Sequence, residues 1–277
     1  MKDQFVIACL GDFSMEREVM SHALFLSRML HKGLILLYVD DPRYKGIDIN
    51  EAEGRLLALE RRYEEAKPMH VAMKGNLKEV IHALPKLLSG VVAVTGVNAH
   101  AFRRTPTHPD SVLRDFADSA IAYLTVQNVL VRPESYSQVA FSVDFNRESK
   151  DKLLWASYFA RFNHSRLHMI HYNYTDGRLR QLWRNNIQFM DKFFGSLKLE
   201  YTPHPIEGRT PLFPEGRVLE ESNALGCGVL ITLTTDLRKR DVIEWFIGTQ
   251  EQRTIRNASL LPVLFLNPRD DFYVLCD

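Results

Sequence analysis

Cysteine is scarce in this 277-residue sequence, and its three cysteines are isolated from one another. Cys9, Cys227 and Cys276 form neither a Cys-x-x-Cys pair nor an even-numbered framework. A disulfide-stapled fold and a cysteine-based zinc site both need such spacings, so the pattern argues against each of them. Reduced thiols in a cytoplasmic protein are the simplest interpretation.

Long apolar runs are also missing. No stretch approaches the ~20 apolar residues that a membrane-spanning helix needs. The apolar run near the start, Phe5 to Leu10, is too short for the core of a signal peptide and stops before Asp12. Neither sign of charge is in excess, because 35 Lys and Arg balance 34 Asp and Glu for a net charge of +1. We therefore expect a cytoplasmic protein with no nucleic-acid and no membrane partner.

Recognisable catalytic signatures are absent as well. The sequence has no Gly-x-Ser-x-Gly and no His-Glu-x-x-His motif. His168 and His171 are three positions apart in a strand-like run, which points their side chains to opposite faces and argues against a shared metal ion. Asp12 and Asp144 stand alone at the ends of predicted strands, where a ligand contact or a helix cap is a simpler role than a general base. The sequence thus predicts no catalytic residue and no metal site, and it favours a protein that is not an enzyme.

The composition provides enough material for two globular domains. Hydrophobic residues make up 45% of the sequence and charged residues 25%, which is typical of soluble globular proteins. A chain of 277 residues is long for one ordinary domain and natural for two.

The same series of sequence segments occurs twice in the chain. FVIACLGDFSMEREVMSHALFLSRMLHKGLILLYV (residues 5–39) corresponds to QVAFSVDFNRESKDKLLWASYFARFNHSRLHMIHY (residues 138–172). Each copy has an apolar run, an Asp-Phe pair, a polar residue that predicts a helix cap, a helical apolar spacing and a second apolar run. The pairs are Asp12-Phe13 and Asp144-Phe145, and the predicted caps are Ser14 and Asn146.

Two further blocks match in the same order. LLSGVVAVTG (residues 87–96) parallels LGCGVLITLTT (residues 225–235), and VQNVLVRP (residues 126–133) parallels LLPVLFLNP (residues 260–268). Alternation of apolar strands with helical patterns predicts βαβ units and a mainly parallel sheet covered on both faces. We therefore predict an α/β fold of two repeated doubly wound domains, residues 1–135 and 136–277.

With this organisation the sequence resembles the universal stress protein family, as a tandem of two domains in one chain. SVDFN (residues 142–146) is similar to the Val-Asp-Gly-Ser segment that ends the first strand in this family, and CLGDFS (residues 9–14) is similar to a lesser degree. PVLFL (residues 262–266) is similar to the fifth strand of the family. The resemblance covers almost the whole chain. It implies a stress-response protein with about five strands in each domain.

Nucleotide-binding members of this family carry Gly-x2-Gly-x9-Gly-[Ser/Thr] after the fourth strand. Glycines there let the backbone approach phosphates, which a helix N-terminus and backbone N–H groups then hold. In the second half, Gly248-Thr249 fits the end of the motif, but Thr235 and Arg238 stand at its first two glycines. The Arg238 side chain either contacts a phosphate or fills its space.

The first half departs further from the motif. Gly96 stands at its first glycine, Ala99 stands at the second, and Leu113-Arg114 lies near the last. The resemblance therefore implies a member that does not bind ATP tightly, with no cofactor or with a weakly bound nucleotide. It offers as ligand residues Asp144, Thr235, Arg238, Gly248 and Thr249 in the second half, and Asp12 and Gly96 in the first.

The resemblance also bears on partners and on a rival function. Members of this family commonly dimerise, so we expect a pseudo-dimer within the chain, a homodimer of chains as a further level, and a protein partner of unknown identity. The main reading is action by protein association or weak sensing of a small ligand. The alternative is an ATP-binding switch, or a nucleotide-dependent enzyme, that works through the second domain.

Overall fold

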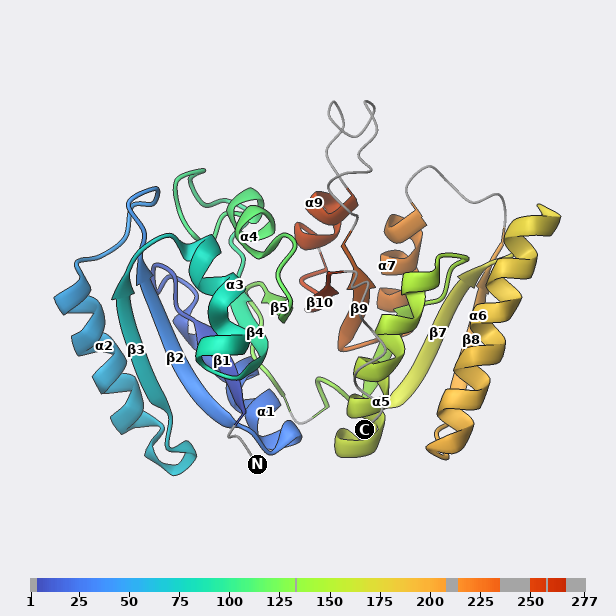
Figure 1. Ribbon diagram of the computed structural model, residues 1–277, viewed down its shortest axis with the longest axis horizontal. Coiled ribbons are helices and arrows are strands. Elements are labelled where there is room, and N and C mark those ends of the chain that lie inside the picture. The colour runs from blue at the N-terminus through green and yellow to red at the C-terminus, as the bar shows by residue number, and fades with distance from the viewer. Residues whose placement is uncertain (1–3, 133, 208–213, 235–249, 258, 268–277) are drawn as a thin grey trace. The chain divides into compact units, whose positions relative to one another are not determined.

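The computed structural model describes residues 4–132, 134–207, 214–234, 250–257 and 259–267 (Figure 1). These residues form two compact units. The first contains the described residues of 1–131 together with 255–262, and the second contains those of 132–254 together with 263–277.

The first unit is built on a parallel sheet with the strand order β3-β2-β1-β4-β5. Val6, Ile7 and Ala8 in the central strand are fully buried, as expected for a sheet that helices cover on both faces. Because β1 has β2 on one side and β4 on the other, the strand order reverses between β1 and β4. The strands are β1 (Phe5–Cys9), β2 (Gly33–Asp40), β3 (Met69–Lys74), β4 (Gly90–Gly96) and β5 (Ala122–Val126).

Helices connect these strands. Right-handed crossovers place α1 and α2 on one face of the sheet and α3 and α4 on the other; α3 packs against α4, and Figure 1 shows both on the near face. Asp48 caps α2, Asn76 caps α3, and the His108 ring followed by Pro109 begins α4. The helices are α1 (Glu16–Leu30), α2 (Ile49–Arg62), the short η1 (Glu64–Ala66), α3 (Leu77–Leu87) and α4 (Pro109–Phe116).

Residues 255–262 complete the first unit from a distant part of the sequence. The Gln127 side chain donates a hydrogen bond to the backbone carbonyl of Asn257 at 3.0 Å. Arg256 forms an ion pair of 2.9 Å with Asp110 in α4. The Asn257 side chain orders the segment itself, because it binds the backbone N–H and C=O of Leu261 at 2.9 and 3.1 Å.

The second unit repeats this architecture. Its parallel sheet has the order β10-β9-β6-β7-β8, in which β6 takes the place of β1 and β9 takes the place of β4. The strands are β6 (Gln138–Ser142), β7 (Arg166–Tyr172), β8 (Tyr201–Ile206), β9 (Val229–Leu233) and β10 (Val263–Leu266). The helices are η2 (Arg147–Lys150), α5 (Asp151–Asn163), α6 (Gly177–Ser196), α7 (Pro214–Ala224) and α9 (Gln250–Ile255).

The ends of α1 and α5 show which residues of the two units are equivalent. α1 ends at His31 and α5 ends at His164, and both histidines adopt the left-handed conformation, with φ values of 53° and 54°. The two positions are 164 − 31 = 133 residues apart. This offset relates equivalent positions of the two helices.

The predicted fold class, two repeated doubly wound α/β domains with mainly parallel sheets, is confirmed. The predicted helix caps are wrong. α1 begins at Glu16 without a side-chain cap, because Phe13 adopts a left-handed φ of 59° and Ser14 turns back to Asp12. α5 begins only at Asp151, since the turn of η2 separates it from Asn146.

Two further sequence features can be placed. Among the described helices, none has the length and apolar character to cross a bilayer.

Cys9 and Cys227 are buried free thiols, and burial raises the pKa of both to about 12. Neither is therefore a reactive thiolate at neutral pH. Cys276 lies outside the described residues.

Candidate functional site

In an open parallel sheet, ligands bind beyond the carboxyl ends of the strands where the strand order reverses. In the first unit this point lies beyond β1 and β4, and in the second it lies beyond β6 and β9. Asp12 follows β1, Gly96 ends β4 and Asp144 follows β6, so these three predicted residues lie at the two expected places. Thr235, Arg238, Gly248 and Thr249 lie outside the described residues.

In the first unit, Asp12 is engaged by its own loop and by the loop after β4. Its Oδ1 accepts hydrogen bonds from the backbone N–H and the hydroxyl of Ser14, at 3.0 and 2.6 Å. Its Oδ2 accepts one from the Thr107 hydroxyl at 3.1 Å. The carboxylate therefore ties together the two loops that border the cleft.

Gly96 serves close packing. A Cβ atom at this position would lie 2.4 Å from Cβ of Met15 and 3.3 Å from Cγ2 of Val19, so the glycine allows the start of α1 to rest on the end of β4. A Cβ atom at Gly11 would lie 2.8 Å from Cγ of Pro106. The loop of residues 97–108 thus covers the end of β1.

A small cavity lies beneath the covering loop, next to Gly11, Pro106 and Thr107. The cavity there measures about 20 Å³, roughly the room that one water molecule needs. Its lining comes from β1, β2 and β4, the covering loop and α4: Cys9, Gly11, Leu37, Val39, Leu77, Thr95, Pro106, Thr107, Val112, Asp115 and Phe116.

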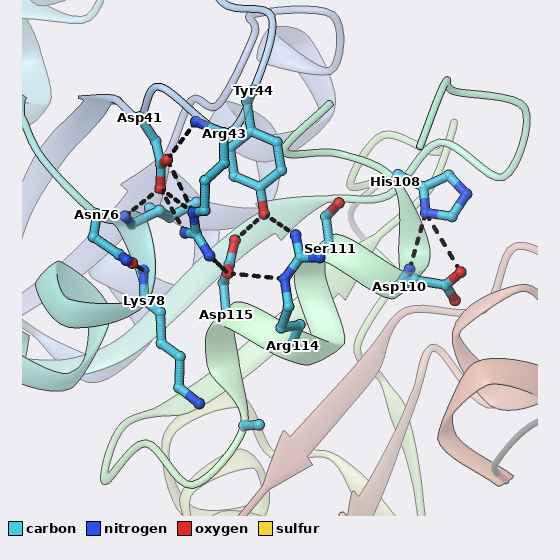
Figure 2. A network of polar contacts seen from close by, with 12 residues as sticks. Asp41, Arg43, Tyr44, Asn76, Lys78, His108, Asp110, Ser111, Arg114 and Asp115 are labelled. Atoms are coloured by element: carbon cyan, nitrogen blue, oxygen red, sulfur yellow. Dashed lines mark hydrogen bonds and ion pairs between the residues drawn. The ribbon is translucent and has the colours of Figure 1, made fainter. Parts of the chain in front are cut away.

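A network of charged side chains joins the loop after β2 to α4 beside this cavity (Figure 2). Arg43 binds Asp41 through Nε at 3.0 Å to both carboxylate oxygens and through Nη2 at 2.5 Å, while its Nη1 lies 3.1 Å from Oδ1 of Asp115. The Asp115 side chain is fully buried and also accepts a hydrogen bond from the Tyr44 hydroxyl. Arg114 donates to the same hydroxyl at 2.7 Å. One guanidinium therefore bridges two carboxylates that are far apart in sequence.

The pKa shifts of three of these groups follow from burial and from the contacts within the network. Burial raises the pKa of Asp41, but hydrogen bonds from Arg43 and from the backbone N–H of Leu77 outweigh it and hold that pKa below its usual value. The hydrogen bond to Asp41 raises the pKa of Arg43. Burial, followed by the hydrogen bond to Asp115, raises the pKa of Tyr44 to about 12. Asp41 and Arg43 therefore stay charged at neutral pH, and the Tyr44 hydroxyl stays neutral.

In the second unit, the loop that carries Asp144 is anchored from α6. Asn186 donates hydrogen bonds to the backbone carbonyls of Asp144 and Asn146, at 2.9 and 2.7 Å. The Asp144 backbone N–H donates to the Ser149 hydroxyl at 3.2 Å, and its Oδ1 accepts from the Asn146 N–H at 2.7 Å. The Asp144 side chain is thereby oriented and remains partly exposed.

A buried lysine is the main difference between the second site and the first. Lys152 in α5 is only 2% exposed, and its Nζ donates a hydrogen bond to the Ser142 hydroxyl, at the end of β6, at 3.0 Å. Burial lowers the pKa of Lys152, while the charges of Asp144 and Glu215 raise it. Subtracting the helix offset, 152 − 133 = 19, shows that the apolar Val19 occupies the equivalent position in α1.

Glu215, in the first turn of α7, faces the same group of side chains. Burial raises its pKa to about 7, opposed by its own backbone N–H and by Lys152. Burial, and next the charge of Asp144, raises the pKa of Tyr174 in the same region. Sequence reasoning missed Lys152 and Glu215; the available signal was a lysine directly before a largely apolar helical segment, LLWASYFA.

His168 and His171 have separate contacts in the second unit. His168 contacts His204 at 2.9 Å between ring nitrogens and Gln138 at 3.0 Å, while the His171 ring lies 4.9 Å from that of Trp183. Within the part of the chain that the structure describes, no three His, Cys, Asp or Glu side chains are grouped to hold a metal ion.

Comparison with known proteins gives a likeness in structure only. No family model matches the sequence, and no curated protein sequence matches it. A universal stress protein from Archaeoglobus fulgidus matches with a TM-score of 0.68 at 17% identity, over 96% of this chain and 97% of that chain. A protein of Pseudomonas aeruginosa described as a universal stress protein matches with a TM-score of 0.63 at 15% identity, over 96% and 94%.

The fold is not restricted to stress proteins. The cytoplasmic domain of a prokaryotic cation chloride cotransporter matches with a TM-score of 0.57 at 11% identity, over 96% of this chain and 95% of that domain. The chain therefore has the tandem fold of universal stress proteins along 96% of its length. Fold alone does not determine function, so the function must be argued from the sites.

Proposed function

We propose, from the tandem universal stress protein fold, that this chain is a cytoplasmic stress-response protein that acts by association with other proteins and does not bind ATP tightly. The observation that carries this proposal is the closure of the cleft beyond β1 and β4. Sites for drug-sized ligands occupy about 300 Å³ or more, whereas the first cleft holds about 20 Å³.

Opening the first cleft would require several contacts to break together. The covering loop is joined across its base by the hydrogen bond from the Asn98 N–H to the Thr107 carbonyl, at 2.9 Å. Thr107 in turn binds Asp12, and Pro106 rests on Gly11. A nucleotide would have to displace this packing before it gained any contact of its own. The first unit thus serves as a scaffold.

The second unit is the better candidate for a weakly bound small ligand. Asp144 is oriented and partly exposed, and Lys152 and Glu215 bring charges of both signs near it. Thr235 and Arg238 replace two glycines of the phosphate-binding motif in the same half. If each lost backbone contact to a charged oxygen costs ~1.5–3 kcal/mol, affinity falls by roughly two to four orders of magnitude.

The alternative function is an ATP-binding switch, or a nucleotide-dependent enzyme, in the second domain. Two features favour it: Gly248-Thr249 matches the end of the motif, and Lys152 offers a cation close to the Asp144 loop. A self-associating tandem is part of the main proposal, as a pseudo-dimer within the chain and as a homodimer of chains.

Calorimetric titration of the full chain with Mg-ATP tests the proposal. We expect a dissociation constant no tighter than about 1 mM, from the motif losses given above. Purified protein should also show no excess absorbance near 260 nm from a retained nucleotide.

Three variants assign any binding to one half. Micromolar binding that survives Asp12→Ala but is lost in Lys152→Met or Arg238→Ala would refute the main proposal and establish the alternative in the second domain. Micromolar binding that is lost only in Asp12→Ala would show that the first cleft opens, and the argument from its closure would fail.

A further inference from the structure

The covering loop of the first unit presents three adjacent side chains to solvent. Phe102 is 86% exposed, more than any other large hydrophobic residue in the described part of the chain. Arg103 and Arg104 follow it and are exposed as well. Single exposed hydrophobic residues are common on protein surfaces. The exposure of Phe102 therefore indicates a binding surface only in combination with an ordered loop backbone and with the charge of the neighbouring side chains.

The loop is ordered by its backbone. Hydrogen bonds to the carbonyls of Phe102, Arg103 and Arg104 hold the loop in place and leave the three side chains out of the interior. Thr105 binds the Phe102 carbonyl through its N–H and its hydroxyl, at 3.0 and 2.8 Å; Ser111 binds that of Arg103 at 3.4 Å, and Lys45 binds that of Arg104 at 2.9 Å. A loop that is already ordered loses little conformational entropy when it binds a partner.

The surroundings of the loop are positively charged. Residues 97–109 contain no Asp and no Glu. Asp12 accepts a hydrogen bond from Thr107 in the loop, and two other nearby acidic side chains are paired with arginines: Asp115 is buried against Arg43, and Asp110 binds Arg256. Burial lowers the pKa of His108, and the positive charges of Arg256, Arg103 and Arg114 lower it further against the opposing charge of Asp110. The side chains of Arg103 and Arg114 therefore contribute to one positive region.

We infer that the Phe102 loop, defined as residues 97–108, docks an acidic protein segment that carries an apolar side chain. Aromatic and arginine side chains are the residue types that contribute most to protein–protein affinity. Carboxylates on the partner complement Arg103 and Arg104, and an apolar side chain covers the Phe102 ring. This inference rests on the proposed action by protein association and assigns that action to a surface.

A single-stranded nucleic acid fits the surface less well. Proteins that bind single strands use several aromatic rings on which successive bases stack, along a basic groove. The loop presents one phenyl ring, that of Phe102, and the imidazole of His100, and the chain carries a net charge of only +1. A single phenyl ring could stack with only one base of such a strand. A protein segment with one apolar anchor uses both features.

Selection of peptides from a random display library on the immobilised full chain tests the inference. We expect the selected peptides to be enriched in Asp and Glu next to an aliphatic or aromatic residue. Phe102→Ala and Arg103→Glu should each weaken the binding of these peptides about tenfold or more, and added salt should weaken it further. Both variants should unfold at the wild-type temperature, because neither side chain packs in the interior.

Matched controls lie in the same unit. Leu87 is a 69% exposed apolar residue in α3, and Arg61 is an exposed arginine in α2. Leu87→Ala and Arg61→Glu should leave peptide binding unchanged. Equal loss in the control variants would overturn the assignment to the Phe102 loop.

The remaining outcomes are also decisive. Acidic peptides that bind Phe102→Ala as well as the wild type would leave protein association standing and remove the Phe102 loop from it. Selection without acidic enrichment, or an oligothymidylate that binds the loop more tightly than any peptide, would overturn the partner chemistry. Tight ATP binding in the calorimetric experiment bears on the proposed function alone, so the two failures are distinguishable.

Discussion

The two units share one topology and use the equivalent place in opposite ways. In the first unit, Met15 and Val19 pack on Gly96 and the cleft is closed. In the second unit, the position equivalent to Val19 is Lys152, a buried lysine whose pKa is lowered by burial and raised by the charges of Asp144 and Glu215. An apolar contact in one copy has become a polar cluster in the other.

This difference shows how a duplicated fold can divide its tasks. A closed cleft contributes stability, because burying apolar surface is favourable, and its buried carboxylate Asp115 is paired with Arg43, so that removing one partner is costly. Buried ionisable groups with shifted pKa values are enriched at functional sites, although structural ion pairs such as that of Arg43 and Asp41 shift pKa values too. The two units therefore differ at this position, which is apolar in the first and ionisable in the second.

The largest predicted effect compares the glycines that lead into β4 and β9. A Cβ atom at Gly228 would lie 1.2 Å from the backbone carbonyl oxygen of Ser135, whereas at Gly90 it would meet only side-chain atoms of Ile121 and Ile7, at 3.1 and 3.2 Å. We expect Gly228→Ala to destabilise the second unit by more than about 4 kcal/mol, and Gly90→Ala to cost about 1 kcal/mol.

Tryptophan fluorescence can separate the two units in this experiment. All three tryptophans of the sequence, Trp155, Trp183 and Trp245, belong to residues 136–277. Urea unfolding followed by fluorescence should shift strongly in Gly228→Ala and hardly in Gly90→Ala. A similar shift in both variants would mean that the two glycines are equivalent in their packing.

The next effect concerns the charged network of the first unit. Asp115→Asn removes a fully buried carboxylate that Arg43 and Tyr44 both bind. Breaking a buried ion pair costs about 3 kcal/mol, and the remaining Asp41 compensates only in part. The exposed pair between Asp110 and Arg256 is the control, since such a pair contributes about 1 kcal/mol or less. Circular dichroism should show a much larger loss for Asp115→Asn than for Asp110→Asn, and equal losses would show that the network does not stabilise the unit.

The smallest effect is the pH dependence that Glu215 contributes to the second unit. Burial raises the pKa of Glu215 from 4.5 to about 7, with Lys152 opposing the shift and Asp144 and Glu251 adding to it. The folded state keeps a proton that the unfolded chain releases, so the free energy of unfolding falls as pH rises from 4.5 to about 7 and levels off above that. The full shift corresponds to about 3.4 kcal/mol, and because Glu215 is partly exposed we expect a loss of about 2 kcal/mol over this range.

Glu215→Gln removes the titrating group and should flatten this part of the profile. Urea unfolding monitored by tryptophan fluorescence at pH 5 and pH 7.5 makes the measurement. An unchanged slope in Glu215→Gln would assign the pH dependence to another group.

The sequence was sufficient for the fold because repeated local patterns specify it. The apolar strands, the helical spacing and the two Asp-Phe pairs recur in order, and each is visible within a short window. The charged network is different, because Asp41 and Asp115 are brought together only by the tertiary structure, through Arg43. No local pattern indicates that contact. The burial of Lys152 could not be predicted for a different reason, since a lysine on a predicted helix is normally exposed.

Residues 255–262 belong to the first unit although they follow most of the second unit in the sequence. This has a consequence for synthesis on the ribosome. Residues 132–254 separate the two stretches that build this unit, which is 254 − 131 = 123 residues. At about 5–20 residues per second, translation of that interval takes roughly 6–25 s. During this time Gln127 and Asp110 are made but their partners, Asn257 and Arg256, are not. The contacts of the first unit are therefore completed only near the end of translation. A nascent chain stalled between the two stretches exposes a surface that residues 255–262 cover in the finished protein.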